Sequence, residues 1–414
     1  MTDSRHVPPH AGGPARPVTA TELIHHEYRP PAGFDAVAPG VFKASTVIFP
    51  SVAALRARRW QSKQAYTYGL HGTPTTFTLE ERLATLEGGR HTLLAPSGLA
   101  ALTLVNMALL GQGDEVLLPD NVYGPNKEWV RGEMSRWGIT HRYYDPLDAR
   151  GAAAMMSDRT RLLWLEAAGS VTLEFPDLRG LTRAARERGV RVALDNTWGA
   201  GLAFNPFAYG EAADPASLGT DISVHALTKY PSGGGDVLMG SVTTIDEALH
   251  LQLKATHMRL GLGVGADDVE LVLRALPSLP LRYAAHDAST RALAAWMSTQ
   301  PEVKAVLHPA LNTSPGHPHW TEACSAAAGL FSVVFHERHD AARIDAFIDA
   351  LRLFKIGYSW GGPMSLAVPY EVGPMRHLGW AQGGPLVRFA VGLERVEDLQ
   401  ADLDQALGAT LRRA

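Results

Sequence analysis

Short apolar runs alternate with longer helical periods from about residue 90 onward. Six of these runs predict buried β-strands at His91–Ala95, Glu115–Leu118, Arg161–Glu166, Val190–Asp195, Ile222–Ala226 and Leu238–Thr243. Helix-like segments such as Leu99–Leu110 and Leu178–Arg188 lie between them. Strands that alternate with helices favour an α/β protein with a mostly parallel sheet, which helices cover on both faces.

The texture of the chain changes after about residue 250, where long helical segments begin. A strand, a helix and a strand are then predicted at Gly329–Phe335, Asp340–Leu353 and Leu386–Val391. We therefore expect a ligand-binding α/β domain over residues 61–259 and a smaller α+β domain over residues 260–414. Residues 1–60 are expected to form an N-terminal arm, in which Thr21–Val47 is an extended segment that embraces a neighbouring subunit.

Composition and charge narrow the classes of function. The 414 residues carry a formal net charge of −4, so no basic excess exists to bind nucleic acid or an anionic membrane. The single cysteine, Cys324, excludes an intrachain disulfide framework, and no group of residues has convincing metal-site spacing. The uncharged stretch Thr92–Gly113 is interrupted near Pro96, so a buried helix after a turn explains it better than a membrane span. Without an apolar signal segment, a cytoplasmic location is expected.

A lysine follows the predicted strand Ile222–Ala226. The hydroxyl of Thr228 directly precedes Lys229, and the glycine run 233–235 shortly after it lets backbone approach a ligand. A lysine at this place can simply be a solvated strand end. If it is desolvated near a cationic ring, its pKa falls, which suits Schiff-base formation and proton abstraction.

A carboxylate ends the predicted strand Val190–Asp195. Aspartate at such a place often supplies a turn or a helix cap. Because the preceding residues have the pattern of a fully buried strand, Asp195 needs a cationic partner, and a protonated pyridine nitrogen would serve. Lys229 and Asp195 together therefore suit the two ends of a pyridoxal phosphate (PLP) ring, its aldehyde and its ring nitrogen.

Three further places carry candidate binding groups. The helix that opens at Gly98 has free N–H groups that can bind a phosphate, unless Ser97 simply caps it. Tyr123 lies in a turn after a strand, where it can stack on an aromatic ring or fill the loop. Arg388 lies in an apolar run, and an arginine buried there needs either a ligand carboxylate or a structural ion pair.

These residues together resemble the Cys/Met-metabolism family of PLP enzymes, which have fold type I, and within it the bacterial cystathionine β-lyases. The resemblance runs from about Thr21 to the C-terminus. It is carried by the motifs Tyr68-Gly-x-x-Gly-Thr-Pro-Thr75, Pro96-Ser-Gly98, Leu194-Asp-Asn-Thr-Trp198, Ala226-Leu-Thr-Lys-Tyr230 and Gly357-Tyr-Ser-Trp-Gly-Gly362.

The resemblance implies a role for each matching residue. Lys229 would hold PLP covalently, Asp195 would pair with the ring nitrogen, and Tyr123 would stack on the ring. The implied catalytic groups are Lys229, Tyr123, Asp195 and Tyr68. The other residues implied to bind the cofactor are Gly98, Leu99, Thr197 and Thr228, together with Tyr68 from a neighbouring subunit.

On the substrate side, the resemblance implies that Arg388 binds the α-carboxylate, assisted by Ser359 and Trp360, with Tyr123 also in contact. The chain departs from the family in two places. Many members have arginine where Leu70 stands, and many have serine where Ala226 stands. Both departures imply a phosphate pocket with fewer direct partners.

The implied activity is that of a PLP-dependent carbon–sulfur lyase. It would split cystathionine or a related cysteine thioether by β-elimination and release a thiol such as homocysteine, with pyruvate and ammonia. The nearest alternative is γ-elimination or γ-replacement with the same cofactor, and a remote one is a binding protein without turnover. The resemblance also implies a homotetramer built from dimers that share active sites, because Tyr68 needs a partner's site. No metal, nucleic acid or membrane is expected.

Overall fold

The structure is a computed structural model that describes residues 18–26, 33, 36–63, 65–209 and 218–412. Its larger sheet has the strand order β1-β7-β6-β5-β4-β2-β3, in which only β7 runs antiparallel to its neighbours. The strands are β1 (His91–Ala95), β2 (Glu115–Pro119), β3 (Thr140–Tyr144), β4 (Thr160–Glu166), β5 (Arg191–Asp195), β6 (Ile222–Ala226) and β7 (Gly240–Thr244). The predicted mostly parallel sheet is confirmed.

Alternate residues of the central strands face two different hydrophobic cores. On β4, Leu162 and Trp164 face one helical layer, whereas Leu163 and Leu165 face the other. The first layer contains α4 (Gly98–Leu109), α5 (Gly124–Trp129) with its continuation η2 (Val130–Met134), and α8 (Glu247–Leu260). The second contains α3 (Pro74–Glu87), α7 (Leu178–Arg186) and α9 (Ala266–Ala275). Because both faces are covered, these strands are apolar throughout.

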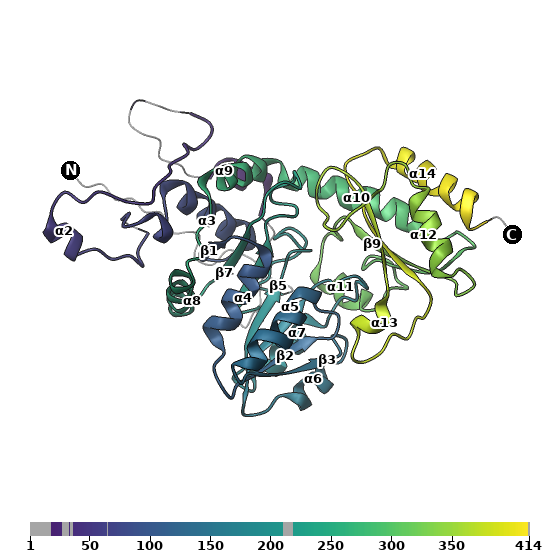
Figure 1. Cartoon of the computed structure of the whole chain (residues 1–414), viewed down its shortest axis with the longest axis horizontal. Helices are drawn as coiled ribbons and strands as arrows, with labels where there is room; N and C mark the ends of the chain where they lie inside the picture. The colour runs from purple at the N-terminus through teal and green to yellow at the C-terminus, as the bar shows by residue number, and fades with distance from the viewer. Residues whose placement is uncertain (1–17, 27–32, 34–35, 64, 210–217, 413–414) are drawn as a thin grey trace.

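A second sheet of five strands has the order β10-β11-β12-β9-β8. Its strands are β8 (Val303–Leu307), β9 (Leu330–Phe335), β10 (Lys355–Ile356), β11 (Leu366–Tyr370) and β12 (Leu386–Ala390). The helices that cover one of its faces are α10 (Leu279–Met297), α12 (Ala341–Asp349) and α14 (Val396–Thr410). Figure 1 shows α12 and α14 on the side of this sheet that points away from the larger sheet.

The uncovered face of the second sheet turns toward the larger one. On β12, Val387 and Phe389 belong to the core under the helices, so the intervening Arg388 points the other way. On β9, Val334 likewise leaves that core and packs with Val171, which comes from a loop after β4. The strand pattern therefore places a buried arginine between the two sheets.

The remaining elements are short: α1 (Ala20–Ile24), α2 (Val52–Arg56), η1 (Gly69–His71), α6 (Ala149–Met155), η3 (Leu276–Ser278), α11 (His317–Ala323) and α13 (Val372–Met375). The prediction that Thr21–Val47 is extended is wrong at its start, where α1 forms. Thr19 and Glu22 exchange side-chain-to-backbone hydrogen bonds in a capping box, which favours a helical turn. Residues 1–17 of the predicted arm lie outside the described residues, and the domain limits at 60 and 260 stay predictions.

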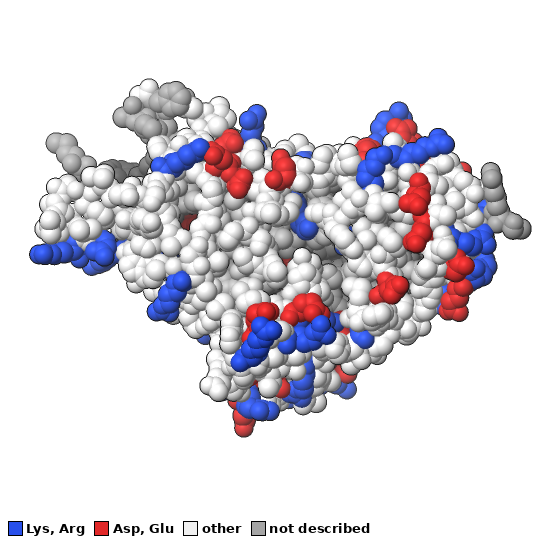
Figure 2. Space-filling view, viewed as in Figure 1, with Lys and Arg blue, Asp and Glu red and all other residues white. Residues whose placement is uncertain are grey.

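The stretch Thr92–Gly113 forms β1, a turn and α4, as a strand followed by a buried helix. In the part of the chain that the structure describes, no helix has the length and apolar character to cross a membrane. The cytoplasmic location stays a prediction. Figure 2 shows acidic and basic side chains scattered over the face in view, without a continuous basic patch.

Candidate active site

The carboxyl ends of β4, β5 and β6 lie side by side and carry ionisable groups. Glu166 pairs with Asp195 across β4 and β5, and Asp195 pairs with Val224 of β6. Lys229 follows β6 in a turn, in which its N–H donates to the carbonyl of Ala226 at 3.1 Å. The fold thus brings the lysine and the aspartate, which are 34 positions apart in the sequence, to one edge of the sheet.

Asp195 is oriented by its own turn. Its Oδ1 accepts hydrogen bonds from the backbone N–H of Thr197 at 3.0 Å and from the Thr197 hydroxyl at 2.5 Å. The same hydroxyl accepts the N–H of Ala226 at 2.9 Å, which fixes the turn to β6. Burial raises the pKa of Asp195, whereas the Thr197 hydrogen bonds lower it. A carboxylate placed in this way favours a cationic partner.

Lys229 is held by the loop that follows β10. Its Nζ donates to Ser359 Oγ at 2.8 Å and lies 5.4 Å from the centre of the Trp360 ring. Burial, with the nearby charge of Arg388, lowers the pKa of Lys229 to about 8, while the Asp195 charge opposes the shift. The lowered pKa increases the share of the neutral amine near pH 7, which is the form that attacks carbonyl groups and accepts protons.

Tyr123 stands at the start of α5 with its side chain 41% exposed toward solvent. Its backbone N–H donates to Glu166 Oε2 at 2.7 Å. Burial, with the charge of Asp195, raises the pKa of Glu166 well above its usual value. Glu166 thus anchors the turn that carries Tyr123. Sequence reasoning did not select Glu166 as a site residue, although its place at a strand end, level with Asp195, was a usable signal.

The N-terminus of α4 lies against the end of β6. Ser97 Oγ caps the helix by accepting the N–H of Ala100 at 3.0 Å. A Cβ on Gly98 would stand 2.6 Å from the Cβ of Ala226, so only glycine fits this approach. The N–H groups of Gly98 and Leu99 are in the first turn, where a helix supplies no acceptor of its own. They are available to an anion.

The hydroxyl of Thr228 is engaged with backbone rather than free. It donates to the Met239 carbonyl at 3.3 Å and accepts the Met239 N–H at 3.2 Å. Tyr68 stands apart from the other predicted site residues: its hydroxyl lies 3.4 Å from Ser45 Oγ and its side chain is 44% exposed. Of the predicted residues, Tyr68 is the one that this chain does not bring to the group around Lys229.

Arg388 is buried with few acceptors. Its Nη2 donates to the carbonyl of Ser359 at a long 3.4 Å, and within the described residues its Nε has no hydrogen-bond partner. Ser359 has a φ of +97°, which is a strained conformation for a residue other than glycine. In this conformation its hydroxyl faces Lys229 and its carbonyl faces Arg388. Burial lowers the pKa of Arg388. A buried guanidinium with open N–H groups is a site for an anion.

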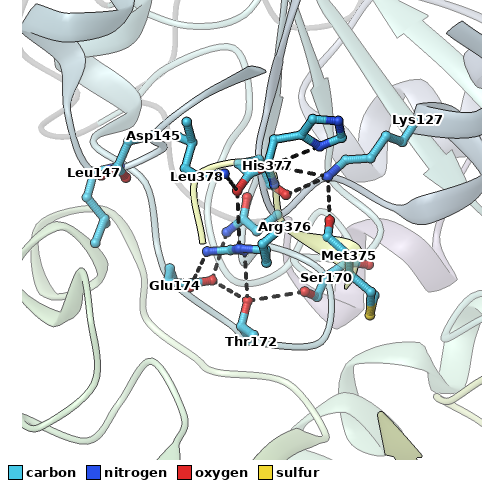
Figure 3. A network of polar contacts seen from close by, with 12 residues as sticks. Lys127, Asp145, Leu147, Ser170, Thr172, Glu174, Met375, Arg376, His377 and Leu378 are labelled. Carbon is cyan, nitrogen blue, oxygen red and sulfur yellow. Dashed lines mark hydrogen bonds and ion pairs between the residues drawn. The ribbon is translucent and has the colours of Figure 1, made fainter. Parts of the chain in front are cut away.

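Residues 375–378, which precede β12, contact the turn before Tyr123 and the loop after β4. Figure 3 shows Arg376 beside Glu174 and Thr172. The carboxylate of Asp120 accepts the backbone N–H groups of His377 at 2.8 Å and Leu378 at 3.0 Å. Arg376 donates to Glu174 at 2.8 Å, in the loop after β4. Both carboxylates are almost fully buried.

A second cation completes this contact. Lys127 Nζ donates to the carbonyl of Met375 at 2.7 Å and to the carbonyl of Asp120 at 2.8 Å. Two buried acids, Asp120 and Glu174, are thus matched by two basic side chains, Lys127 and Arg376. We call these four residues the inter-lobe ion cluster, since Arg376 belongs to the lobe built on the second sheet and the other three belong to the lobe built on the larger sheet. Because Asp120 lies three positions before Tyr123, the cluster links the segment before β12 to the turn that carries Tyr123.

Arg376→Met is expected to lower the free energy of unfolding by about 3–5 kcal/mol, because it leaves a buried carboxylate without its cation. Urea unfolding of the holoenzyme measures the loss. The matched control is Arg131→Met, whose exposed partner is Glu128 at 2.6 Å, and a loss below about 1 kcal/mol is expected there. Equal losses in the two variants would contradict a stabilising role for the inter-lobe ion cluster.

The residues at the sheet edge fit PLP. The partly buried amine of Lys229 suits its aldehyde, the Asp195 carboxylate suits a cationic ring nitrogen, and the start of α4 suits a phosphate. The exposed ring of Tyr123 lies at the same edge. Because Gly98 has no side chain, the start of α4 presents backbone N–H groups to the place where the phosphate would bind.

Comparisons with known proteins agree with this chemistry. Residues 20–408 match the family described as Cys/Met metabolism PLP-dependent enzyme. The chain is 39% identical to the cystathionine beta-lyase of Bordetella avium, over 92% of this chain and 94% of the relative. It is 37% identical to a putative cystathionine beta-lyase of Rhizobium johnstonii, over 94% of this chain and 96% of the relative. The crystal structure of metB from Corynebacterium glutamicum superposes with a TM-score of 0.84 at 26% identity, covering 94% of this chain and 97% of that one.

Proposed function

Because the chain belongs to the Cys/Met metabolism family of PLP-dependent enzymes and is a PLP-dependent carbon–sulfur lyase, we propose that its substrate is cystathionine itself. β-Elimination would then release homocysteine and 2-aminoacrylate, which one water hydrolyses to pyruvate and ammonia. The observation that supports the PLP chemistry most is the amine of Lys229, which donates to Ser359 Oγ at 2.8 Å and whose pKa burial lowers to about 8. The choice of cystathionine is supported by the relatives that carry the name cystathionine beta-lyase. γ-Elimination or γ-replacement remains the alternative.

PLP, when bound, supplies an electron sink for the negative charge that develops at the substrate Cα. Lys229 would hold the cofactor through Nζ, and the same atom, when free, would be the base that accepts the substrate Cα proton. A pKa of about 8 lets this amine act as a base near neutral pH. Asp195, oriented by Thr197, would hold a proton at the pyridine nitrogen.

The other residues would orient the substrate and the cofactor. Arg388 would bind the α-carboxylate with the N–H groups that the protein leaves open. Ser359, which accepts a hydrogen bond from Lys229 Nζ, would keep this amine directed at the substrate Cα. Trp360 would close the distal side of the pocket. The ring of Tyr123 would stack on the cofactor, whose phosphate would accept hydrogen bonds from the backbone N–H groups of Gly98 and Leu99.

A product assay separates β- from γ-chemistry. Incubation of the holoenzyme with cystathionine is expected to yield pyruvate and homocysteine in equal amounts, because the thiolate leaves from Cβ when the cysteine half of the substrate is bound at Arg388. Mass spectrometry of the thiols and a keto-acid assay measure both products, with substrate-free holoenzyme as the control. Formation of 2-oxobutyrate and cysteine would contradict the proposal. A panel of cysteine S-conjugates, assayed in the same way, would rank the thioethers.

We further propose that the enzyme acts as a homo-oligomer in the cytoplasm. Several large apolar side chains of the N-terminal segment are exposed, among them Ile48 at 85% and Val52 at 60%. Such side chains, gathered in one segment, favour burial against another subunit. Tyr68 lies shortly after this segment and is 44% exposed, as is expected of a residue that reaches a partner's active site.

A further inference from the structure

Tyr370, the last residue of β11, lies beside Arg388. The strand register pairs Val368 with Arg388 and Tyr370 with Leu386, so Tyr370 is the diagonal neighbour of Arg388 on the same face of the sheet. The guanidinium carbon lies 5.3 Å from the centre of the Tyr370 ring. This distance is within the range of a cation–π contact.

The Tyr370 ring is fixed from behind. It packs against the apolar cluster that includes Val171, in the loop after β4, and Val372, just after β11. The ring of Tyr358 meets it edge-on, with 6.4 Å between the ring centres. Burial raises the pKa of the Tyr370 phenol, so the ring stays neutral beside the guanidinium. A ring held in this way presents a constant face to Arg388.

The orientation of the Arg388 guanidinium depends on contacts such as this one with the Tyr370 ring. The buried guanidinium has one long hydrogen bond, to the Ser359 carbonyl, the Tyr370 hydroxyl as a neighbouring hydrogen-bonding group, and an Nε without a partner within the described residues. Few hydrogen bonds therefore fix its plane before a substrate arrives. Stacking on an aromatic ring fixes the plane of a guanidinium without using its N–H groups, which remain at its edge for a carboxylate.

We propose that the ring face of Tyr370 positions the guanidinium of Arg388 for the substrate α-carboxylate. Tyr370 is thus a positioning residue that acts through Arg388 on substrate affinity, while proton transfer at Cα is left to Lys229. The inference rests on the proposed function, in which Arg388 is the carboxylate site. It goes further by assigning a residue that none of the sequence motifs contains.

The test compares Tyr370→Leu, which removes the ring, with Tyr370→Phe, which keeps it. In the leucine variant the KM for cystathionine is expected to rise about 5- to 30-fold, the equivalent of a lost cation–π contact, with kcat nearly unchanged. The phenylalanine variant is expected to stay within about threefold of the parent enzyme. Tyr370→Met, which also lacks a ring, replaces the leucine variant if that variant does not fold.

A binding measurement gives a readout independent of turnover. The visible spectrum of the holoenzyme is titrated with L-alanine and with ethylamine, which differ only in the carboxylate. In Tyr370→Leu the Kd for alanine is expected to rise by the same factor as the KM, whereas the Kd for ethylamine stays unchanged. Unaltered alanine binding, equal weakening of both ligands, or a phenylalanine variant as poor as the leucine variant would each overturn the inference.

Arg388→Ala separates this inference from the proposed function. If that variant binds alanine as well as the parent does, then the carboxylate role of Arg388 is wrong and the inference falls with it. If Arg388→Ala weakens alanine selectively while Tyr370→Leu does not, only the role of Tyr370 is wrong. Selective weakening in both variants supports the two assignments together.

Discussion

Lys229→Ala is expected to abolish turnover and to remove the visible absorbance of the bound cofactor. The variant loses both the amine that would hold PLP and the base that would accept the Cα proton. A general base alone contributes about 10²- to 10⁴-fold, so kcat/KM is expected to fall by about 10⁴-fold or more. Pyruvate release from cystathionine, followed together with the absorbance spectrum of the purified variant, measures both losses.

The control for this variant is Lys304→Ala, because Lys304 is a surface lysine that pairs with Glu337 at 3.0 Å, away from the sheet edge. Its spectrum and its activity are expected to match those of the parent enzyme. Circular dichroism establishes that both variants are folded. An alanine variant at 229 that keeps the visible band and cleaves cystathionine at the parent rate would end the assignment of Lys229.

Asp195→Asn is expected to lower kcat by about 150- to 5,000-fold. The amide has nearly the shape of the carboxylate and can keep the contacts with Thr197, but it carries no negative charge. Removing one member of a partly desolvated ion pair costs about 3–5 kcal/mol, which is the source of this factor. The same loss should weaken retention of the cofactor, which dialysis followed by absorbance measures.

Asp340→Asn is the matched control, since Asp340 caps α12 through Oδ1 at 2.9 Å from the N–H of Arg343 and asparagine caps equally well. No change in kcat or in cofactor retention is expected there. An Asp195→Asn enzyme within tenfold of the parent in kcat would show that the charge at this position is not needed.

The parts of the fold that could be predicted are those in which a buried element leaves a run of apolar residues in the sequence. The apolar runs of β1, β4, β5 and β6 mark strands that helices cover on both faces. Asp195 and Lys229 could be selected because each is polar and stands where such a run stops. β3 was missed because its sequence, Thr-His-Arg-Tyr-Tyr, lies at the sheet edge with its first residues open to solvent.

What could not be predicted depends on contacts between distant parts of the chain. Asp120 meets the N–H of His377, which is 257 positions away, and neither sequence neighbourhood indicates the other. Tyr370 likewise gains its place beside Arg388 only through the register of β11 and β12. Tyr68 lies apart from the rest of the group in this chain, with its hydroxyl 3.4 Å from Ser45 Oγ, and its place in a neighbouring subunit's site stays a prediction.

A crystal structure of the enzyme grown with PLP tests the central assignment most directly. We predict continuous density from Lys229 Nζ to the cofactor, with the ring nitrogen in hydrogen-bond contact with the Asp195 carboxylate. A cofactor attached to another lysine, or bound with Lys229 and Asp195 on opposite sides of an unrelated pocket, would contradict it.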